Sequence, residues 1–394
     1  MDAGRCQGDG GSGGGGGVDP GSSDAGPCDY FLNPQPGDLC FHRFATMAPL
    51  LGVVGERDAS VEVINVTGLA GECFESGVLA PNGNVIAVPY DSQNPMVIPA
   101  DVNHPLAAVD CTIGTAEFAG GVVSRNGKVY LIPFASRTDL SIANPVTGVL
   151  TGAGHVSTGD QDWWAGVVAR DGRIVLSPSK STKAGIFDPS DAGLQLWDCN
   201  DPSTTGRFSG AVVTSTDEVW LVPNSAGDWY RVDFQNRTTT PVGLTASSTR
   251  RGWYGATLGG DGWLYPPPDR AGELWRIDPR TGLSQSYGNV PMSDTWAAGA
   301  LGQDGRIYIC PDRASTILVI EPAGNATSVI WYQLPVPSTA LAGSGGTSFG
   351  AAVTSSDGRT YCIPASGKAL LAITPQSSRR LPLDVLLSPH FDKY

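Results

Sequence analysis

A phrase that runs from an aromatic residue to a proline fifteen positions later recurs seven times along the chain. The aromatic residues are Phe74, Phe118, Trp163, Phe208, Trp253, Trp296 and Phe349, and the prolines are Pro89, Pro133, Pro178, Pro223, Pro268, Pro311 and Pro364. Successive copies begin 44, 45, 45, 45, 43 and 53 residues apart. A period of this length indicates one small structural unit that is repeated and stacked.

The interior of the phrase predicts a tight β-hairpin. Its third and fourth positions are always small, and small residues in a strand let neighbouring backbones approach closely. We therefore expect Gly166, in the third copy, to lie on an innermost strand where several strands converge. Six copies continue with Asn-Gly or Asp-Gly, such as Asp171-Gly172, which tolerate the positive φ angles of hairpin turns. The fourth copy has Thr216-Asp217 instead, so its turn should differ.

Two further strands are predicted in each repeat. A third strand ends at motifs such as Ile277-Asp-Pro279, which is followed by a turn at Thr281-Gly282. A short polar strand then fits before the next aromatic residue. About 45 residues with four short strands make one blade of a β-propeller. The sequence thus predicts an all-β fold, a single seven-bladed β-propeller of four-stranded antiparallel blades, over residues 61–394.

The chain before the repeats divides into two predicted parts. Residues 1–27 are rich in Gly, Ser and Asp, and such a segment cannot bury enough apolar surface to become ordered. We expect a disordered, Gly-rich N-terminal tail that acts as a tether. Residues 28–60 contain Tyr30, Phe31 and Phe41, so they predict an extension that packs on the propeller.

Two segments compete for the strand that closes the ring. Residues 61–66 read as a strand and occupy the place where other repeats put their fourth strand. Residues 380–387 are the alternative, but Pro382 would interrupt their hydrogen-bond ladder. We favour closure by the N-terminal strand, which would join the first and last blades and leave no large unpaired edge.

The eight cysteines give few firm pairings. Cys28 and Cys40 are close enough in sequence to form a small disulfide loop. The absence of a Cys-x-x-Cys spacing argues against a zinc site. Cys310 and Cys362 lie on the second strands of the sixth and seventh copies. Packed sheets lie about 10 Å apart, whereas disulfides need Cα atoms within about 7 Å, so we expect two buried thiols.

Charge and hydropathy exclude some functions. The net charge of −13 argues against nucleic acid as a partner, because phosphate backbones require a basic surface. No apolar run approaches the roughly 18 residues of a membrane span. The Gly-rich tether and the acidic surface favour an extracytoplasmic or cell-surface location, with the cytoplasm as the alternative.

Ligands usually bind a propeller on the face that carries the loops before each first strand and after each second strand. The candidate ligand-binding residues in these loops are Glu72, Glu117, Asp162, Arg207, Arg251, Asp294, Asp269, Arg270, Asp312 and Arg313. A ring with Glu72, Glu117, Asp162 and Asp294 could supply oxygen ligands to a divalent cation, although solvated loop charges are the more common explanation. The Asp-Arg pairs at 269–270 and 312–313 would either link neighbouring blades or clamp an anion.

Other residue types offer weaker candidates. The histidines are His42, His104, His155 and His390. None of them recurs with the repeat, so no catalytic residue is assigned. Trp163 and Trp164 could form a stacking platform for sugars, but we expect packing between blades instead.

The phrase and its Ile-Asp-Pro-x-Thr-Gly exit, as at residues 277–282, resemble the blades of NHL-like, streptogramin-lyase-like and SMP-30-like seven-bladed propellers. The resemblance covers about 300 of the 394 residues. It implies the propeller fold. For the lyases it implies a metal with a catalytic histidine, and for the lactonases a Glu-Asn-Asn-Asp calcium site. Neither set maps onto the repeat positions of this chain.

Together these features predict a non-catalytic binding module that takes a protein or carbohydrate ligand on the loop face and needs no cofactor. The alternative is a metal-dependent lyase or lactonase that uses the acidic loop residues with Ca²⁺ or Mg²⁺.

Overall fold

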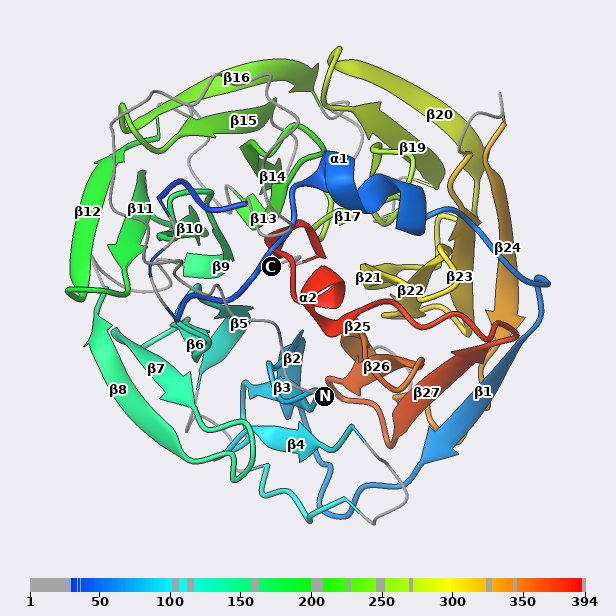
Figure 1. Cartoon of the computed structure of the whole chain (residues 1–394). Helices are drawn as coiled ribbons and strands as arrows, with labels where there is room; N and C mark the ends of the chain where they lie inside the picture. Colours follow the sequence, from blue (N-terminus) through cyan, green and yellow to red (C-terminus); the bar gives the residue numbers. More distant parts are fainter. Residues whose placement is uncertain are drawn as a thin grey trace.

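The computed structural model is a ring of small β-sheets arranged around a common axis (Figure 1). It describes residues 30–33, 35, 37–100, 106–111, 117–156, 163–199, 208–224, 228–245, 252–268, 272–323, 328–342 and 346–391. The predicted tether, residues 1–27, and Cys28 lie outside the described residues. None of the helices in the described ranges has the length and hydropathy needed to cross a membrane.

Five separate blades account for most of the ring. One has three strands: β2 (Phe74–Leu79), β3 (Val85–Pro89) and β4 (Met96–Ile98). Two have four strands each: β5 (Phe118–Val123), β6 (Val129–Pro133), β7 (Asp139–Ala143), β8 (Leu150–His155); and β9 (Trp163–Val168), β10 (Ile174–Pro178), β11 (Lys183–Asp188), β12 (Gly193–Asp198). Two more have four strands: β13 (Phe208–Val213), β14 (Val219–Pro223), β15 (Asp228–Asp233), β16 (Thr238–Thr245); and β17 (Thr257–Leu258), β18 (Leu264–Tyr265), β19 (Glu273–Asp278), β20 (Leu283–Asn289).

The remaining strands form one eight-stranded sheet. In chain order they are β1 (Ala59–Ile64), β21 (Trp296–Leu301), β22 (Ile307–Pro311), β23 (Thr316–Glu321), β24 (Ile330–Pro335), β25 (Phe349–Thr354), β26 (Thr360–Pro364) and β27 (Leu370–Pro375). The sheet order is β1-β27-β26-β25-β21-β22-β23-β24, so the sixth and seventh copies of the repeat share one sheet.

The all-β propeller is confirmed, but the prediction of seven four-stranded antiparallel blades is wrong. There are five separate blades, one of which has only three strands in the described residues, and an eight-stranded sheet that contains a parallel pair. The merger rests on one parallel pair of residues. Ala298 of β21 and Ala351 of β25 face each other across the parallel pairing, and both are almost fully buried. Their small side chains let the two backbones come within hydrogen-bonding distance.

The repeated phrase forms the hairpin that the sequence predicts. In the first copy, for example, Phe74 lies opposite Pro89 at the open end of the β2–β3 hairpin. Gly83 and Gly127 occupy their turns with φ angles of 87° and 79°. In the fourth copy Asp217 takes the positive φ angle, at 60°. The hairpins are therefore set by local turn chemistry and hydrophobic pattern.

The N-terminal extension runs along one face of the ring, across the hairpin turns of several repeats (Figure 1). The Tyr30 hydroxyl donates to the carbonyl of Val168 at 3.0 Å, and the Leu39 amide donates to the carbonyl of Arg125 at 2.7 Å. The short helices α1 (Phe44–Met47) and η1 (Ala48–Leu50) follow. Arg43 pairs with Asp217, with 2.9 Å between Nε and Oδ2. We call this side of the ring the turn face.

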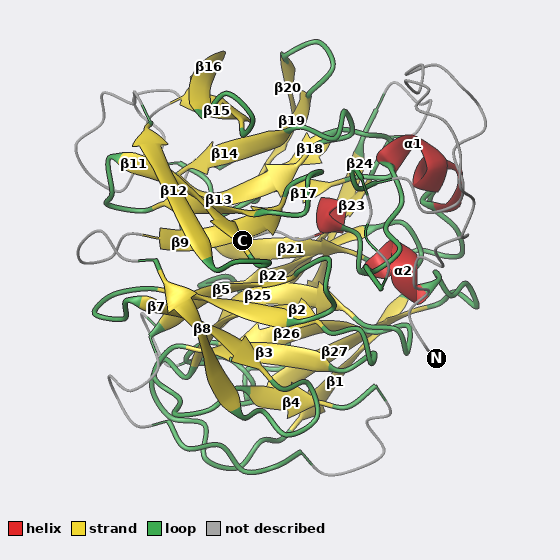
Figure 2. Cartoon of the chain, turned by 60° about the vertical axis from the view of Figure 1, so that its left-hand side comes forward, coloured by secondary structure: helices red, strands yellow, loops and turns green. Residues whose placement is uncertain are grey.

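The C-terminal segment closes the centre of the turn face. It forms α2 (Leu383–Leu386) and η2 (Pro389–Phe391), and Figure 2 shows α1 and α2 on the same side of the ring. Leu386 and Phe391 line a cavity of about 40 Å³ against the inner strands. Nε2 of His390 lies 2.9 Å from Oδ1 of Asp217, which fixes the end of the segment beneath the fourth repeat.

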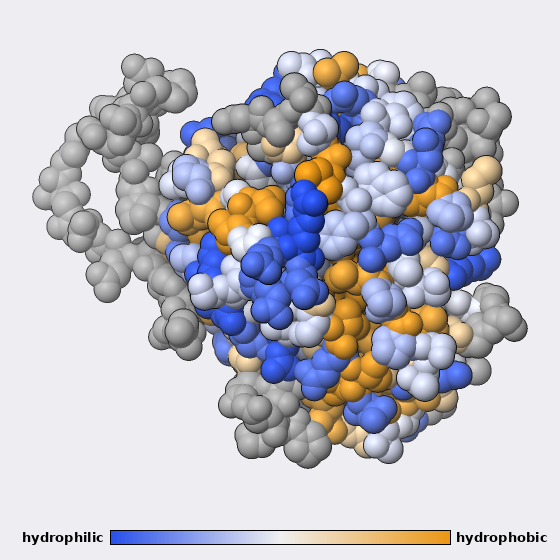
Figure 3. Space-filling model, turned by 90° about the vertical axis from the view of Figure 1, so that its right-hand side faces the viewer, coloured by the Kyte–Doolittle hydropathy of each residue, from blue (hydrophilic) through white to orange (hydrophobic). Residues whose placement is uncertain are grey.

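Closure by the N-terminal strand is confirmed. β1 pairs antiparallel with β27 from Ala59–Pro375 to Ile64–Leu370. The alternative segment, residues 380–387, turns into α2 instead. The side of the molecule that carries β20, β24 and β1 shows a band of hydrophobic residues between hydrophilic ones (Figure 3). There Val61 of β1 and Leu334 of β24 pack partly buried against the hydrophobic cluster of the eight-stranded sheet.

The prediction of two buried thiols at Cys310 and Cys362 is wrong. The two residues form a disulfide, and their Cα atoms are 5.7 Å apart. The expected 10 Å spacing does not apply, because the first strands of the two hairpins, β21 and β25, pair directly at Ala298 and Ala351 and so bring the two hairpins closer than ordinary packed sheets. Cys40 is also disulfide-bonded, and its suggested partner Cys28 lies outside the described residues.

Replacing Gly166 with Leu should destabilise the ring. Gly166 lies on inner strand β9, and a Cβ atom there would lie 2.7 Å from Cδ1 of Ile132 and 2.8 Å from the carbonyl oxygen of Val175. Overpacking a core costs about 1–3 kcal/mol. We expect a clearly lower melting temperature in thermal unfolding. Gly152→Leu is the matched control, because nothing lies within 4 Å of its Cβ position on β8. Equal melting temperatures for the two variants would mean that Gly166 is not crowded.

Candidate functional site

The face opposite the turn face carries the loops before each inner strand and after each second strand, and we call it the loop face. The two described termini contact the turns, so the candidate ligand-binding loops are on the other side of the ring. The part of the loop face around the start of β2 gathers acidic and aromatic side chains. Its members are Glu72, Glu75, Tyr90, Glu117, Phe134, Trp164 and Asp312.

Two of these residues sit in β-bulges. Phe74 pairs with Pro89 and Ser76 pairs with Val88, so Glu75 has no opposite partner on β3. In the same way Trp164 is skipped in the pairing of β9 with β10. A bulge turns its residue out of the regular alternation of a strand. Glu75 and Trp164 are therefore redirected at the loop-face end of their inner strands.

Glu75 lies in a strongly negative environment. Burial, together with the negative charges of Glu72 and Asp312, raises the pKa of the Glu75 carboxyl to about 8. Among the described residues no cation opposes this shift, and the Glu75 carboxylate makes no hydrogen bond. Part of the residue nevertheless remains accessible to solvent. At neutral pH the carboxyl is therefore mostly protonated, and a cation that bound beside it would favour its charged form.

The same charges act on Tyr90. Burial and the carboxyl groups of Glu75 and Glu72 raise the pKa of the Tyr90 hydroxyl to about 12. Asp91 and Glu117 add smaller contributions in the same direction. The phenol thus stays protonated at physiological pH and can donate a hydrogen bond.

Aromatic rings form one wall beside the carboxylates. The ring of Phe134 lies 6.0 Å from that of Tyr90 and 4.9 Å from that of Trp164, centroid to centroid. Trp164 is partly exposed and packs against a small cluster formed by Ala165, Ala298 and Ala351. Its indole Nε1 is buried and has no hydrogen-bond partner. The exposed part of the wall therefore offers aromatic surface, whereas the indole N–H of Trp164 is buried.

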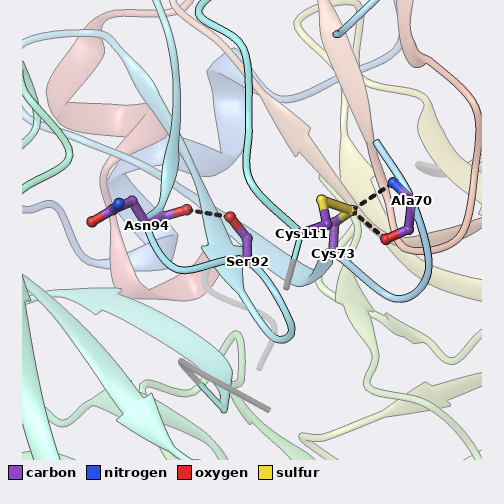
Figure 4. Close-up of a disulfide and its surroundings, with 5 residues drawn as sticks. All are labelled: Ala70, Cys73, Ser92, Asn94 and Cys111. Atoms are coloured by element: carbon purple, nitrogen blue, oxygen red, sulfur yellow. Dashed lines mark hydrogen bonds between the residues drawn. A yellow bond between two sulfur atoms is a disulfide. The ribbon is translucent and has the colours of Figure 1, made fainter. Parts of the chain in front are cut away.

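A disulfide braces the loop that leads into Glu75. Cys73 and Cys111 are bonded, with 5.2 Å between their Cα atoms (Figure 4). The Cys73 carbonyl accepts hydrogen bonds from the amides of Tyr90 and Ser92, at 2.9 and 3.2 Å. The Ser92 hydroxyl donates to the Asn94 carbonyl at 2.8 Å. Tyr90 and the strand that carries Glu75 are thereby held in a fixed relation.

The structure brings only part of the predicted site together. Asp162, Arg207, Arg251, Asp269 and Arg270 lie outside the described residues. Glu72 and Asp312 lie close enough to Glu75 to raise its pKa. Asp294 accepts a hydrogen bond from its neighbour Ser293 at 3.2 Å. Arg313 is exposed, and no ion pair joins it to Asp312 in the described part of the chain.

Glu117 and Asp312 each have a local structural partner. Glu117 has a φ angle of 53°, and its Oε2 accepts hydrogen bonds from the amide and hydroxyl of Ser136. Oδ2 of Asp312 accepts from the Thr295 hydroxyl at 2.8 Å, whereas its Oδ1 is buried without a partner. One carboxylate oxygen of Asp312 is therefore buried and unpaired among the described residues.

The described residues do not assemble the predicted acidic ring into a metal site. The one group with ligand atoms within 4.8 Å of one another is Cys40, His42 and Asp384, on the turn face. Cys40 is disulfide-bonded and offers no thiolate. Of the described histidines, His42 and His390 lie on the turn face, and His155 pairs with Asp139 at an exposed blade edge.

No known sequence family and no curated protein matches the chain. Solved structures do match. Virginiamycin B lyase from Staphylococcus aureus is 13% identical over 80% of this chain and 99% of its own, with a TM-score of 0.65. The extracellular domain of the putative hybrid two-component system BT4673 from B. thetaiotaomicron is 10% identical over 82% of this chain and 40% of its own, with a TM-score of 0.58. YCF48 bound to D1 peptide is 12% identical over 84% and 99%, with a TM-score of 0.56. At these identities the likeness concerns the fold, and the chain is a streptogramin-lyase-like β-propeller in architecture.

Proposed function

We propose that the protein is a non-catalytic binding module that takes a protein ligand on its loop face. The observation that carries this proposal is the loop-face cluster itself, in which Glu75, with no opposing cation among the described residues, lies near Tyr90 and its neighbouring aromatic rings. Aromatic residues that combine apolar surface with a polar group are typical of interface centres. The opposite face is occupied by the chain's own termini.

A protein ligand suits this cluster better than a neutral carbohydrate. A neutral glycan would cover Glu75 and Asp312 without supplying a positive charge, which would increase the cost of burying them. A protein brings cationic side chains and backbone carbonyls. One structural neighbour, YCF48, is known with a bound peptide, which is in keeping with this use of a propeller face.

The metal-dependent lyase or lactonase has less support. Its acidic ring is not assembled among the described residues, and no described histidine lies in the loop-face cluster. Heat release or a thermal shift on titration with Ca²⁺ or Mg²⁺ would support the metal-dependent enzyme instead.

An oxidising, extracytoplasmic location fits the same proposal. Two disulfides, Cys73–Cys111 and Cys310–Cys362, link parts of the described chain, and Cys40 is disulfide-bonded as well. Structural disulfides persist outside the reducing cytosol. Extracellular domains are among the structural neighbours.

Panning a displayed library of random peptides on the immobilised protein tests the function. We expect peptides whose binding falls at least 30-fold in Trp164→Ala, the loss that corresponds to about 2 kcal/mol for an interface centre. Tyr90→Ala is a second variant, should Trp164→Ala fail to fold. Trp331→Ala, on outer strand β24, is the matched control and should bind normally. Failure to select any peptide, or peptides equally weakened by the control, would contradict the proposal.

A further inference from the structure

The N-terminal extension and the C-terminal segment meet on the turn face, away from the loop-face cluster. In Figure 1 the segment before α1 runs beside the segment that contains α2. Nε2 of His42 lies 2.8 Å from Oδ2 of Asp384, so a hydrogen bond joins the two segments. Cys40 completes the group, because its sulfur and one ligand atom of each other residue all lie within 4.8 Å of one another. Three side chains of metal-binding type thus converge from opposite ends of the chain.

Solvent can reach part of this group. Cys40 is 5% exposed, whereas the side chains of His42 and Asp384 are 14% and 24% exposed. Nδ1 of His42 is buried and has no hydrogen-bond partner among the described residues, so the hydrogen bonding of this ring depends on Nε2. An ion can therefore approach the carboxylate and the imidazole from solvent.

The backbone holds Cys40 and His42 in place by contacts other than the disulfide of Cys40. The Tyr30 amide donates to the carbonyl of Phe41 at 3.2 Å, and the Phe41 ring is buried in the core at 1% exposure. Phe41 lies between Cys40 and His42 in the sequence, and His42 is itself bonded to Asp384. Breaking the disulfide should therefore leave the three side chains close together.

We propose that Cys40, His42 and Asp384 form a redox-gated zinc site, which takes a Zn²⁺ ion when the disulfide of Cys40 is reduced. A dithiol reductant exchanges with this disulfide, releases two protein thiols and itself becomes a disulfide. Zinc then displaces the proton of the Cys40 thiol, and His42 binds through Nε2 with its proton on Nδ1. An oxygen of Asp384 is the third protein ligand, and water is the fourth ligand. The same sulfur holds either the disulfide or the metal, so the redox state of the surroundings selects between them.

The ligand types favour zinc over calcium and magnesium. Calcium and magnesium are hard cations that take oxygen ligands, whereas zinc is commonly held by thiolate, imidazole and carboxylate in a tetrahedron. The nitrogen and oxygen ligands of such a tetrahedron are about 3.3 Å apart. The pair of His42 and Asp384, now at 2.8 Å, must therefore separate by roughly half an ångström. Side chains that are partly exposed can make a shift of this size.

Zinc at this site would link the two segments that cover the turn face. Cys40 and His42 belong to the N-terminal extension and Asp384 to α2 (Figure 2). A ligand that binds the folded state alone raises its stability. The reduced protein should therefore unfold at a higher temperature with zinc than without it, whereas the oxidised protein should not respond. The loop face takes no part, so this proposal and the binding module are tested separately.

The experiment uses the full chain, oxidised or reduced with a dithiol that is removed under nitrogen before any metal is added. Isothermal titration with Zn²⁺ gives the affinity and stoichiometry, and Co²⁺ absorption reports a cobalt–thiolate bond. The variants are Cys40→Ser, His42→Ala and Asp384→Asn. His155→Ala is the matched control, because His155 and Asp139 form another histidine–aspartate pair at 2.8 Å, outside the proposed group.

We expect the reduced wild type and His155→Ala to bind one zinc ion with equal affinity, and each site variant to bind it about tenfold more weakly or worse. The oxidised wild type should bind zinc no more tightly than reduced Cys40→Ser. Asp384→Asn nearly preserves the shape of the side chain, so it tests the site even if another variant fails to fold.

Three results would overturn the zinc site. The first is a reduced wild type that binds no zinc. The second is equal zinc affinity in the oxidised and reduced wild type, since the disulfide would then have no effect on binding. The third is zinc binding that is unchanged in Cys40→Ser or in Asp384→Asn, which would place the ion on other side chains.

Discussion

Replacing both Cys310 and Cys362 with Ala should lower the free energy of unfolding by about 4 kcal/mol. The disulfide closes a loop with a sequence separation of 52 residues, and cross-links of that length restrict the unfolded chain to about this extent. Both cysteines are fully buried, so the cross-link is also shielded from reductants in the folded state. Urea unfolding, with the free energy extrapolated to water, measures the change.

Cys199→Ala provides the control for this experiment. Cys199 is buried but not disulfide-bonded, so its variant removes a buried sulfur without removing a cross-link. We expect a loss of about 1 kcal/mol, since only a small side chain is truncated. The wild type in reducing agent should unfold at a lower urea concentration, because the reducing agent breaks the cross-links of the unfolded chain. A double variant as stable as Cys199→Ala would show that the bond contributes no net stability.

The hairpins could be predicted from sequence because their causes are local. Turn residues such as Gly83 and Gly127 specify the connection, and alternating apolar residues specify the strands. The merger of the sixth and seventh repeats could not be predicted in this way. It depends on how closely Ala298 and Ala351 approach, and small residues occupy the equivalent position in every other repeat as well. The disulfide at Cys310 follows from that approach and was missed for the same reason.

Only part of the candidate site could be predicted from the sequence. Glu72 and Asp312 were identified because they lie beside the repeated aromatic and proline residues. Glu75 was missed as a site residue, and Trp164 was considered as a stacking residue but assigned to packing between blades, because both follow the aromatic position and look like ordinary strand residues. Their signal is the bulge, which recurs one residue after the aromatic in several repeats. In such a phrase this position should be read as facing the loop-side centre of the ring.

Glu75→Gln should stabilise the free protein at alkaline pH. The Glu75 carboxyl has its pKa raised from 4.5 to about 8 on folding, by burial and by Glu72 and Asp312. Between these values the folded state binds more protons than the unfolded state, so this carboxyl favours folding below pH 4.5 and loses that contribution as pH rises to 8. Glutamine stays uncharged at every pH, so the variant avoids the cost of ionising a buried carboxyl. At about 1.4 kcal/mol per pKa unit the whole shift would give roughly 5 kcal/mol, and partial solvent contact reduces our expectation to about 2–4 kcal/mol.

The pH profile separates this effect from a simple change in packing. The difference in unfolding free energy between Glu75→Gln and the wild type should be small at pH 4, should grow from pH 5 to pH 8, and should level off above that. Glu56→Gln, whose carboxylate is exposed, should follow the wild type at every pH. A difference that does not depend on pH would place the Glu75 carboxylate in solvent and remove the electrostatic basis of the loop-face cluster. A difference in unfolding free energy that grows with pH would mean that the ionised Glu75 carboxylate destabilises the free protein. A cationic ligand would relieve this destabilisation on binding.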